Sequence, residues 1–106
     1  MTWPGDADGD VFRRLQSHGF DFEKLYAVDY IIEFKDWPPP VQALADLRRN
    51  YQSVRVFEPS DGQNGYVQVT IRELVRYERV ILVQRQLTNQ MLIYGGVCDS
   101  WGVLQE

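Results

Sequence analysis

The sequence of 106 residues is poor in the side chains that most often bind metals or carry nucleophilic chemistry. It contains one cysteine, Cys98, and one histidine, His18. A single cysteine cannot form a disulfide within the chain, which fits a reducing compartment such as the cytoplasm. One cysteine and one histidine cannot complete a zinc site without several carboxylates. We therefore expect no disulfide, no metal and no other cofactor.

Long apolar runs and phosphate-binding loops are also missing. No window approaches the roughly 18 to 20 apolar residues of a membrane span. The opening "MTWPGDADGD" has neither the basic nor the apolar region of a secretory signal. The glycines form neither G-x-x-x-x-G-K nor G-x-G-x-x-G. These absences predict a cytoplasmic protein that does not enter a membrane and has no nucleotide-binding loop.

The charge balance is acidic, with a formal net charge of −4. This disfavours sequence-independent binding to nucleic acid, whose affinity comes largely from basic residues on phosphates. Acidic residues crowd the first third of the chain: Asp6, Asp8, Asp10, Asp21, Glu23, Asp29, Glu33 and Asp36. An acidic surface attracts basic partners, so a protein partner is expected rather than RNA or DNA.

The stretch "WPGDADGDVFRRL" places Asp6, Asp8 and Asp10 at alternating positions, as at the start of a calcium loop. A calcium loop of the EF-hand type also needs glycine at its sixth position and glutamate at its twelfth. Val11 and Ser17 stand there instead. The stretch is better explained as a helix start in which Asp8 or Asp10 is the N-cap. This helix is expected to run to about His18 and to end at Gly19.

The remaining pattern predicts alternating strands and helices. In "KLYAVDYIIEF" the apolar residues alternate onto one face and Asp29 and Glu33 onto the other. A second helix is expected in "VQALADLRRN" and a third over residues 77–94, ended by Gly95 and Gly96. Further strands are expected in "QSVRVFE", "YVQVTI" and "VCDSWGVLQ", with a hairpin turn at Asn64-Gly65 between the first two.

In the helix of "VQALADLRRN", Val41, Leu44, Ala45 and Arg48 follow helical spacing. In the third helix the apolar stripe is expected to contain Val80, Gln84, Leu87, Met91 and Tyr94. The element order predicts an α+β fold, the ferredoxin-like split β-α-β sandwich. It would have a four-stranded antiparallel sheet, two helices on one face and an additional N-terminal helix. Residues 1–106 are expected to form one domain.

Two other functional classes stay open. An enzyme would use Cys98 or a pair of carboxylates, but Cys98 has no base near it in sequence. An RNA-recognition domain would display aromatic residues on its open sheet face. That face is expected to carry Tyr66, Gln68 and Thr70 beside Asp29 and Glu33. One tyrosine among acids is a poor stacking surface, so direct RNA binding is not expected.

Two segments carry a family resemblance. "DGDVFRRLQSHGFDFEKLYAVDYIIEFKD" resembles the opening of the RraB family, bacterial regulators of ribonuclease E activity. "GGVCDSWGVLQE" resembles its closing "YDGWG" signature, with Cys98 in place of tyrosine and Ser100 in place of glycine. Asp99, Trp101 and Gly102 are retained. The best-known members also have a longer acidic extension before the first helix.

The resemblance implies a non-catalytic regulator that binds ribonuclease E, chiefly its non-catalytic degradosome segment, by protein–protein contact. The alternative is an adaptor or immunity-type module on the same fold with a different partner. The predicted partner-binding residues are Asp8, Asp10, Asp29, Glu33, Asp99 and Trp101. For Trp101 a structural role remains open, in which its ring packs under a helix and Gly102 permits close backbone approach.

Overall fold

The computed structural model describes residues 3–103 and contains three α-helices, one 3-10 turn and four strands. In chain order these are α1 (Ala7–Ser17), β1 (Leu25–Phe34), α2 (Val41–Asn50), β2 (Ser53–Phe57), β3 (Tyr66–Leu74), α3 (Tyr77–Met91), η1 (Leu92–Tyr94) and β4 (Gly96–Val103). The predicted order of helices and strands is confirmed. The end of the last predicted strand, residues 104–105, lies outside the described residues.

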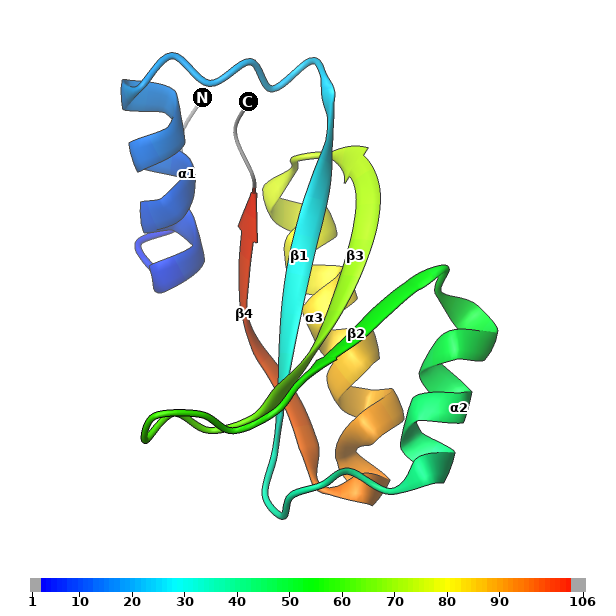
Figure 1. The fold of residues 1–106 in the computed structure, drawn as a ribbon. Helices are drawn as coiled ribbons and strands as arrows, with labels where there is room; N and C mark the ends of the chain where they lie inside the picture. The colour runs from blue at the N-terminus through cyan, green and yellow to red at the C-terminus, as the bar shows by residue number, and fades with distance from the viewer. Residues whose placement is uncertain (1–2, 104–106) are drawn as a thin grey trace.

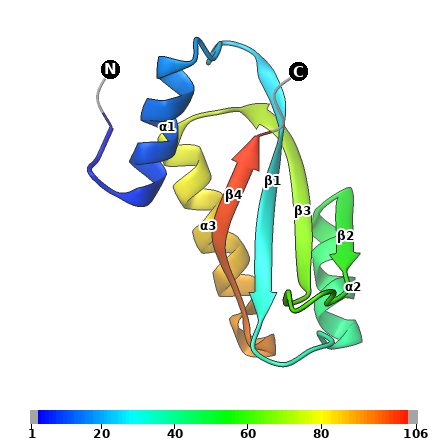
Figure 2. The ribbon, with the colours of Figure 1, turned by 60° about the vertical axis from the view of Figure 1, so that its left-hand side comes forward.

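The four strands form one antiparallel open sheet in the order β2-β3-β1-β4. Helices α2 and α3 lie behind the sheet in both views (Figures 1 and 2). Helix α1 packs against α3, at the end where β4 finishes. No helix of residues 3–103 covers the opposite sheet face, which is called the open face below.

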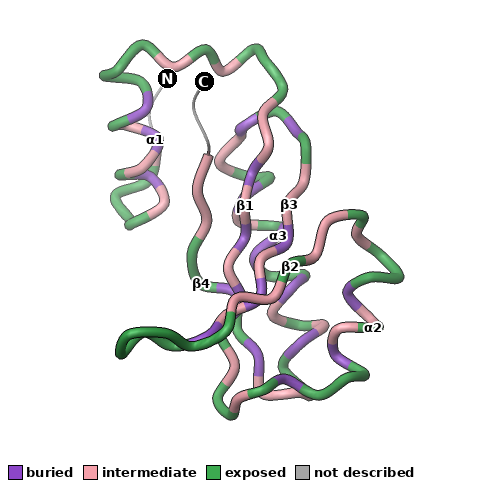
Figure 3. The backbone as a smooth tube through the Cα atoms, in the orientation of Figure 1, coloured by how far each residue is buried: buried purple, intermediate pink, exposed green. Residues whose placement is uncertain are grey.

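The core follows from the alternation of the two central strands. Val28, Tyr30 and Ile32 of β1 are fully buried, and their neighbours on β3 include the buried Val67 and Val69. Figure 3 shows these buried positions alternating with more exposed ones along both strands. Successive side chains of a strand point to opposite faces, so one face meets the helices. The alternation predicted for the strand in "KLYAVDYIIEF" is confirmed, and β3 follows the same pattern.

Two helices complete the core. The expected stripe on α3 is confirmed, because Val80, Gln84, Leu87 and Met91 are buried, although the α-helix stops at Met91 and Tyr94 lies in η1. The expected face of α2 was wrong. Its buried residues are Ala43 and Leu47, whereas Val41 is 84% exposed. Val41 is the first residue of that helix and lies beyond the area that α2 buries.

The expected turn at Asn64-Gly65 was also wrong. The chain reverses at Asp61 and Gly62, which have positive φ and lie between the bridged residues Ser60 and Gln63. Gly65 is buried instead, and a Cβ there would lie 2.7 Å from the ring of Trp37. Both Asp-Gly and Asn-Gly pairs favour this kind of turn, and close packing against Trp37 explains the second glycine.

One polar network is buried among these apolar residues. The Tyr30 hydroxyl donates to the Glu73 carboxylate at 2.5 Å, and Arg79 Nε donates to the other carboxylate oxygen at 2.9 Å. Burial, together with the bond to Glu73, raises the pKa of Tyr30 above its ordinary value. The network satisfies groups that would be costly to bury without partners, and it joins β1, β3 and α3.

We expect truncation of Leu87 to destabilise the protein much more than truncation of Leu82 on the same helix. Leu87 is fully buried, whereas Leu82 is 45% exposed. Leu87→Ala should lower the free energy of unfolding by about 2–5 kcal/mol, and Leu82→Ala by about 1 kcal/mol or less. Urea unfolding followed by circular dichroism measures both. Equal losses would contradict this assignment of the core.

Candidate functional site

The start of α1 is fixed by Asp6, so the predicted cap at Asp8 or Asp10 was wrong. The Asp6 carboxylate accepts from the backbone N–H of Gly9 at 2.7 Å and from the Tyr77 hydroxyl at 2.5 Å. These bonds, that of Tyr77 first, lower the pKa of Asp6. Their contribution to stability is therefore present above the unfolded value of about 3.9 and is lost as the pH falls through the lower folded value.

Asp8 and Trp101, from opposite ends of the chain, are in direct contact. The Trp101 indole N–H donates to the Asp8 carboxylate at 2.8 Å, and Gln84 of α3 donates to its other oxygen at 3.4 Å. The Trp101 ring packs against the buried ring of Phe12, with centroids 5.4 Å apart. The two sequence segments that carried the family resemblance thus meet, and the packing of Trp101 under α1 agrees with the structural alternative.

The N-terminal segment folds back along α1. Arg13 donates from one guanidinium nitrogen to the carbonyls of Trp3 and Pro4, each at 3.0 Å. A Cβ at Gly9 would lie 1.9 Å from the Pro4 carbonyl oxygen, so this approach requires glycine. By contrast, a Cβ at Gly102 would meet nothing within 4 Å. The close approach predicted at Gly102 was therefore wrong.

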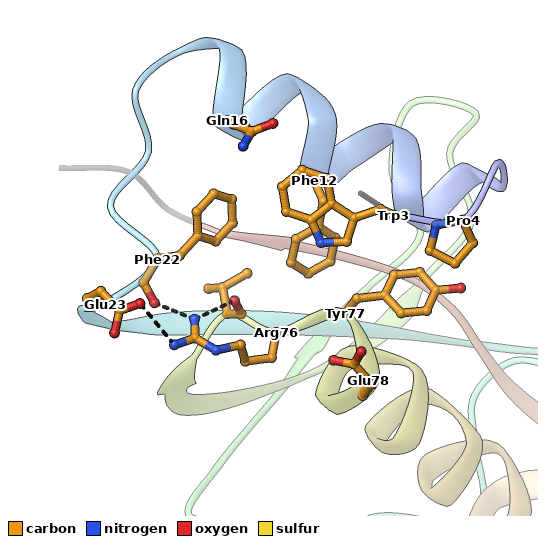
Figure 4. A pocket seen from close by; sticks show the side chains of 10 residues that line it. Trp3, Pro4, Phe12, Gln16, Phe22, Glu23, Arg76, Tyr77 and Glu78 are labelled. Carbon is orange, nitrogen blue, oxygen red and sulfur yellow. Dashed lines mark hydrogen bonds and ion pairs between the residues drawn. The ribbon is translucent and has the colours of Figure 1, made fainter. Parts of the chain in front are cut away.

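The folded-back segment, α1 and the β3–α3 junction enclose a groove of about 500 Å³ (Figure 4). Four aromatic rings and three charged side chains are among its lining residues. The residues that line this aromatic groove are Trp3, Pro4, Phe12, Gln16, Phe22, Glu23, Val75, Arg76, Tyr77 and Glu78. Largely apolar concave surfaces with a few polar groups are the usual form of binding sites.

The Arg76 side chain lies along the β3–α3 side of the groove, with the carboxylates of Glu23 and Glu78 on either side of it (Figure 4). The Arg76 guanidinium donates to the Phe22 carbonyl, to the Val75 carbonyl at 3.3 Å and to Glu23 at 3.5 Å. These bonds fix the guanidinium plane, while 37% of the side chain stays exposed. Glu78 is exposed in the first turn of α3, where the helix N-terminus stabilises a negative charge.

Asp29, Glu33 and Asp99 do not line the groove and form an acidic strip along β1 and β4. Asp29 and Glu33 lie on the open face, since both alternate with the buried residues of β1. Their β4 neighbours are Gly102 and Val97, and Asp99 is the extra residue at the bulge between these two levels. Asp29 accepts from the Thr70 hydroxyl at 2.6 Å, whereas Glu33 and Asp99 are exposed.

The structure therefore divides the six predicted residues into two groups. Asp8 and Trp101 are bonded to each other, and Asp10 is on the same helix, exposed and paired with Arg13. The other three make the acidic strip. The aromatic groove was not predicted from the sequence. Its walls come from segments as far apart as Trp3 and Tyr77. Within each segment, the sequence pattern does not distinguish the aromatic residue from a residue of the hydrophobic core.

The single cysteine and the single histidine lie in different surroundings. Cys98 is buried, and burial raises the pKa of its thiol to about 12. A nucleophilic cysteine needs a thiolate near neutral pH, so this site does not suit the thiol chemistry considered above. His18 caps the exposed end of α1, where its Nδ1 lies 2.7 Å from the Arg14 carbonyl oxygen.

Neither a metal site nor a membrane helix is found within residues 3–103. No three histidine, cysteine, aspartate or glutamate side chains in this range are placed to hold an ion. Over the same range, every helix is too short or too polar to cross a bilayer.

One family of known proteins matches the chain. The family model described as RraB, regulator of ribonuclease activity B, matches residues 5–103. The chain belongs to the RraB family. That match includes α1, the whole sheet and both residues of the Asp8–Trp101 contact. RraB is a regulator family, which is consistent with a non-enzymatic role. No curated protein matched the chain.

We expect Gly9→Ala to displace the N-terminal segment from the groove, because the new methyl group would collide with the Pro4 carbonyl. Gly5→Ala is the control, since a Cβ there meets nothing within 4 Å. The Trp3 indole N–H resonance, assigned with Trp3→Phe, should shift toward its value in a disordered peptide in Gly9→Ala only. An unmoved Trp3 resonance in Gly9→Ala would contradict the described packing.

Proposed function

We propose that this chain is a non-catalytic, cytoplasmic regulator that binds an endoribonuclease of the ribonuclease E type by protein–protein contact and modulates RNA degradation. The observation that carries the proposal is the family match over residues 5–103. The strand order β2-β3-β1-β4, with crossover helices α2 and α3, supports the finer description of the fold as ferredoxin-like.

The contact surface is assigned to the three residues of the acidic strip, of which Glu33 and Asp99 are exposed and Asp29 is half-buried. Asp29 and Glu33 lie on the open face of β1, and Asp99 lies on the neighbouring edge strand β4. Carboxylates so arranged form charge-assisted bonds with arginine and lysine side chains of a partner. Asp10 is an exposed carboxylate on α1 that is paired with Arg13. Asp8 and Trp101 are assigned a positioning role, since each is bonded within the chain.

Purified ribonuclease E tests the proposal in a binding assay and an RNA-cleavage assay. Wild-type protein should bind the enzyme after nuclease treatment and slow cleavage of a model RNA. The double variant Glu33→Gln/Asp99→Asn should bind about 2- to 30-fold more weakly, because each exposed ion pair contributes about 0.2–1 kcal/mol. The affinity of the variant should also depend less on salt.

Asp61→Asn is the matched control, because it removes an exposed carboxylate from the β2–β3 turn, where asparagine accepts the same backbone. It should bind like the wild type. Equal affinity of the double variant and the control would reject the acidic strip as the contact surface. Absence of binding to ribonuclease E would reject this partner, and binding only through RNA would reject protein contact.

A further inference from the structure

We propose that the aromatic groove is a docking site for an aromatic side chain of a partner protein, carried on a segment with basic residues beside it. The inference rests on the proposed function only in that the partner is a protein. It adds a second contact surface to the acidic strip, on the helical side of the molecule, and it specifies the chemistry that the surface recognises.

The shape and lining of the groove suit a bulky apolar side chain. The walls include the half-buried rings of Trp3, Phe22 and Tyr77, with buried Phe12 behind them. The Trp3 and Phe22 centroids are 5.7 Å apart and tilted, and Phe12 lies 5.5 Å from Trp3. Aromatic pairs favour such offset and tilted arrangements, so an incoming ring would extend a cluster that is already in place.

Arg76 makes an aromatic side chain a better occupant than an aliphatic one. Its guanidinium faces the groove and is held by two carbonyl oxygens and Glu23 (Figure 4). A planar guanidinium stacks favourably on an aromatic face. Because Arg76 is already fixed, little side-chain entropy is lost when a ring stacks on it.

The rim selects basic neighbours of that ring. Glu23 and Glu78 lie at the rim, and Arg76 is paired with Glu23. Beyond the lining, Asp6 is bonded to Tyr77 on the groove wall, and Arg13 behind Trp3 and Pro4 is paired with Asp10. The local charge is thus negative around an apolar pocket. An aromatic anchor with flanking lysine or arginine complements both properties.

Three peptides separate these contributions when titrated into the whole protein and followed by NMR. They are acetyl-GRFRG-amide, acetyl-GRARG-amide without the ring, and acetyl-GEFEG-amide with reversed charge. The first should shift the Trp3 indole N–H and the amides of Phe22, Tyr77 and Glu78. The second peptide should bind at least about tenfold more weakly than the first, because the buried ring is lost. The third peptide should not bind measurably.

Variants of the groove give an independent test. Trp3→Ala removes one wall near the chain end and should abolish binding of the first peptide. Glu78→Gln removes only a rim charge and should weaken it by about 2- to 5-fold. The controls are Val41→Ala and Asp61→Asn, which change exposed residues outside the groove and should leave binding unchanged.

The outcomes distinguish this inference from the proposed function. Peptide binding in the groove without any binding of ribonuclease E would support the groove and reject the proposed partner. Ribonuclease E binding that depends on the acidic strip, with no groove resonance shifted by any peptide, would overturn the groove inference alone. Equal binding of all three peptides, or stronger shifts of groove resonances with a short single-stranded RNA, would also overturn it.

Discussion

The hydrogen bond from the Trp101 indole to Asp8 joins the two ends of the described chain. Helix α1 precedes the alternating strands and helices and belongs to no crossover of the sheet. It is attached by a few specific contacts: Asp8 on Trp101, Asp6 on Tyr77, and Phe12 on the aromatic residues between them. The position of α1 then fixes the N-terminal segment, through Arg13 and Gly9, and so forms the aromatic groove.

This dependence explains why short motifs at both ends carry the family resemblance. In "DGD", Asp8 binds the tryptophan, Gly9 admits the folded-back chain and Asp10 pairs with Arg13. In "DSWG", Trp101 supplies the donor and the ring. Neither motif contains a catalytic set. The contacts of Asp8, Gly9 and Trp101 are structural, whereas Asp99 is exposed at a bulge.

Much of the fold could be predicted from the sequence because burial on a sheet alternates. The pattern of Val28, Tyr30 and Ile32 identified the core face of β1 without further information. The predictions were wrong at the N-cap of α1 and at the β2–β3 turn, where contacts between distant segments determine the local structure. Asp6 rather than its neighbours caps α1 because Tyr77, 71 residues away, bonds to it. Gly65 does not form the turn; it is buried against Trp37, and Asp61-Gly62 makes the reversal.

The candidate site was predictable in part for the same reason. Acidic residues on a strand could be placed on one face by alternation. A groove whose walls come from separate segments of the chain leaves no periodic signal in the sequence.

The most direct test of the contact between the chain ends is a double-mutant cycle of Asp8→Ala and Trp101→Phe, with Asp10→Ala and Trp101→Phe as the control cycle. The Asp8–Trp101 hydrogen bond should give a coupling of about 1–3 kcal/mol in the free energy of unfolding for the first pair, and the second pair should be additive. Additive losses for Asp8 and Trp101 would contradict this prediction.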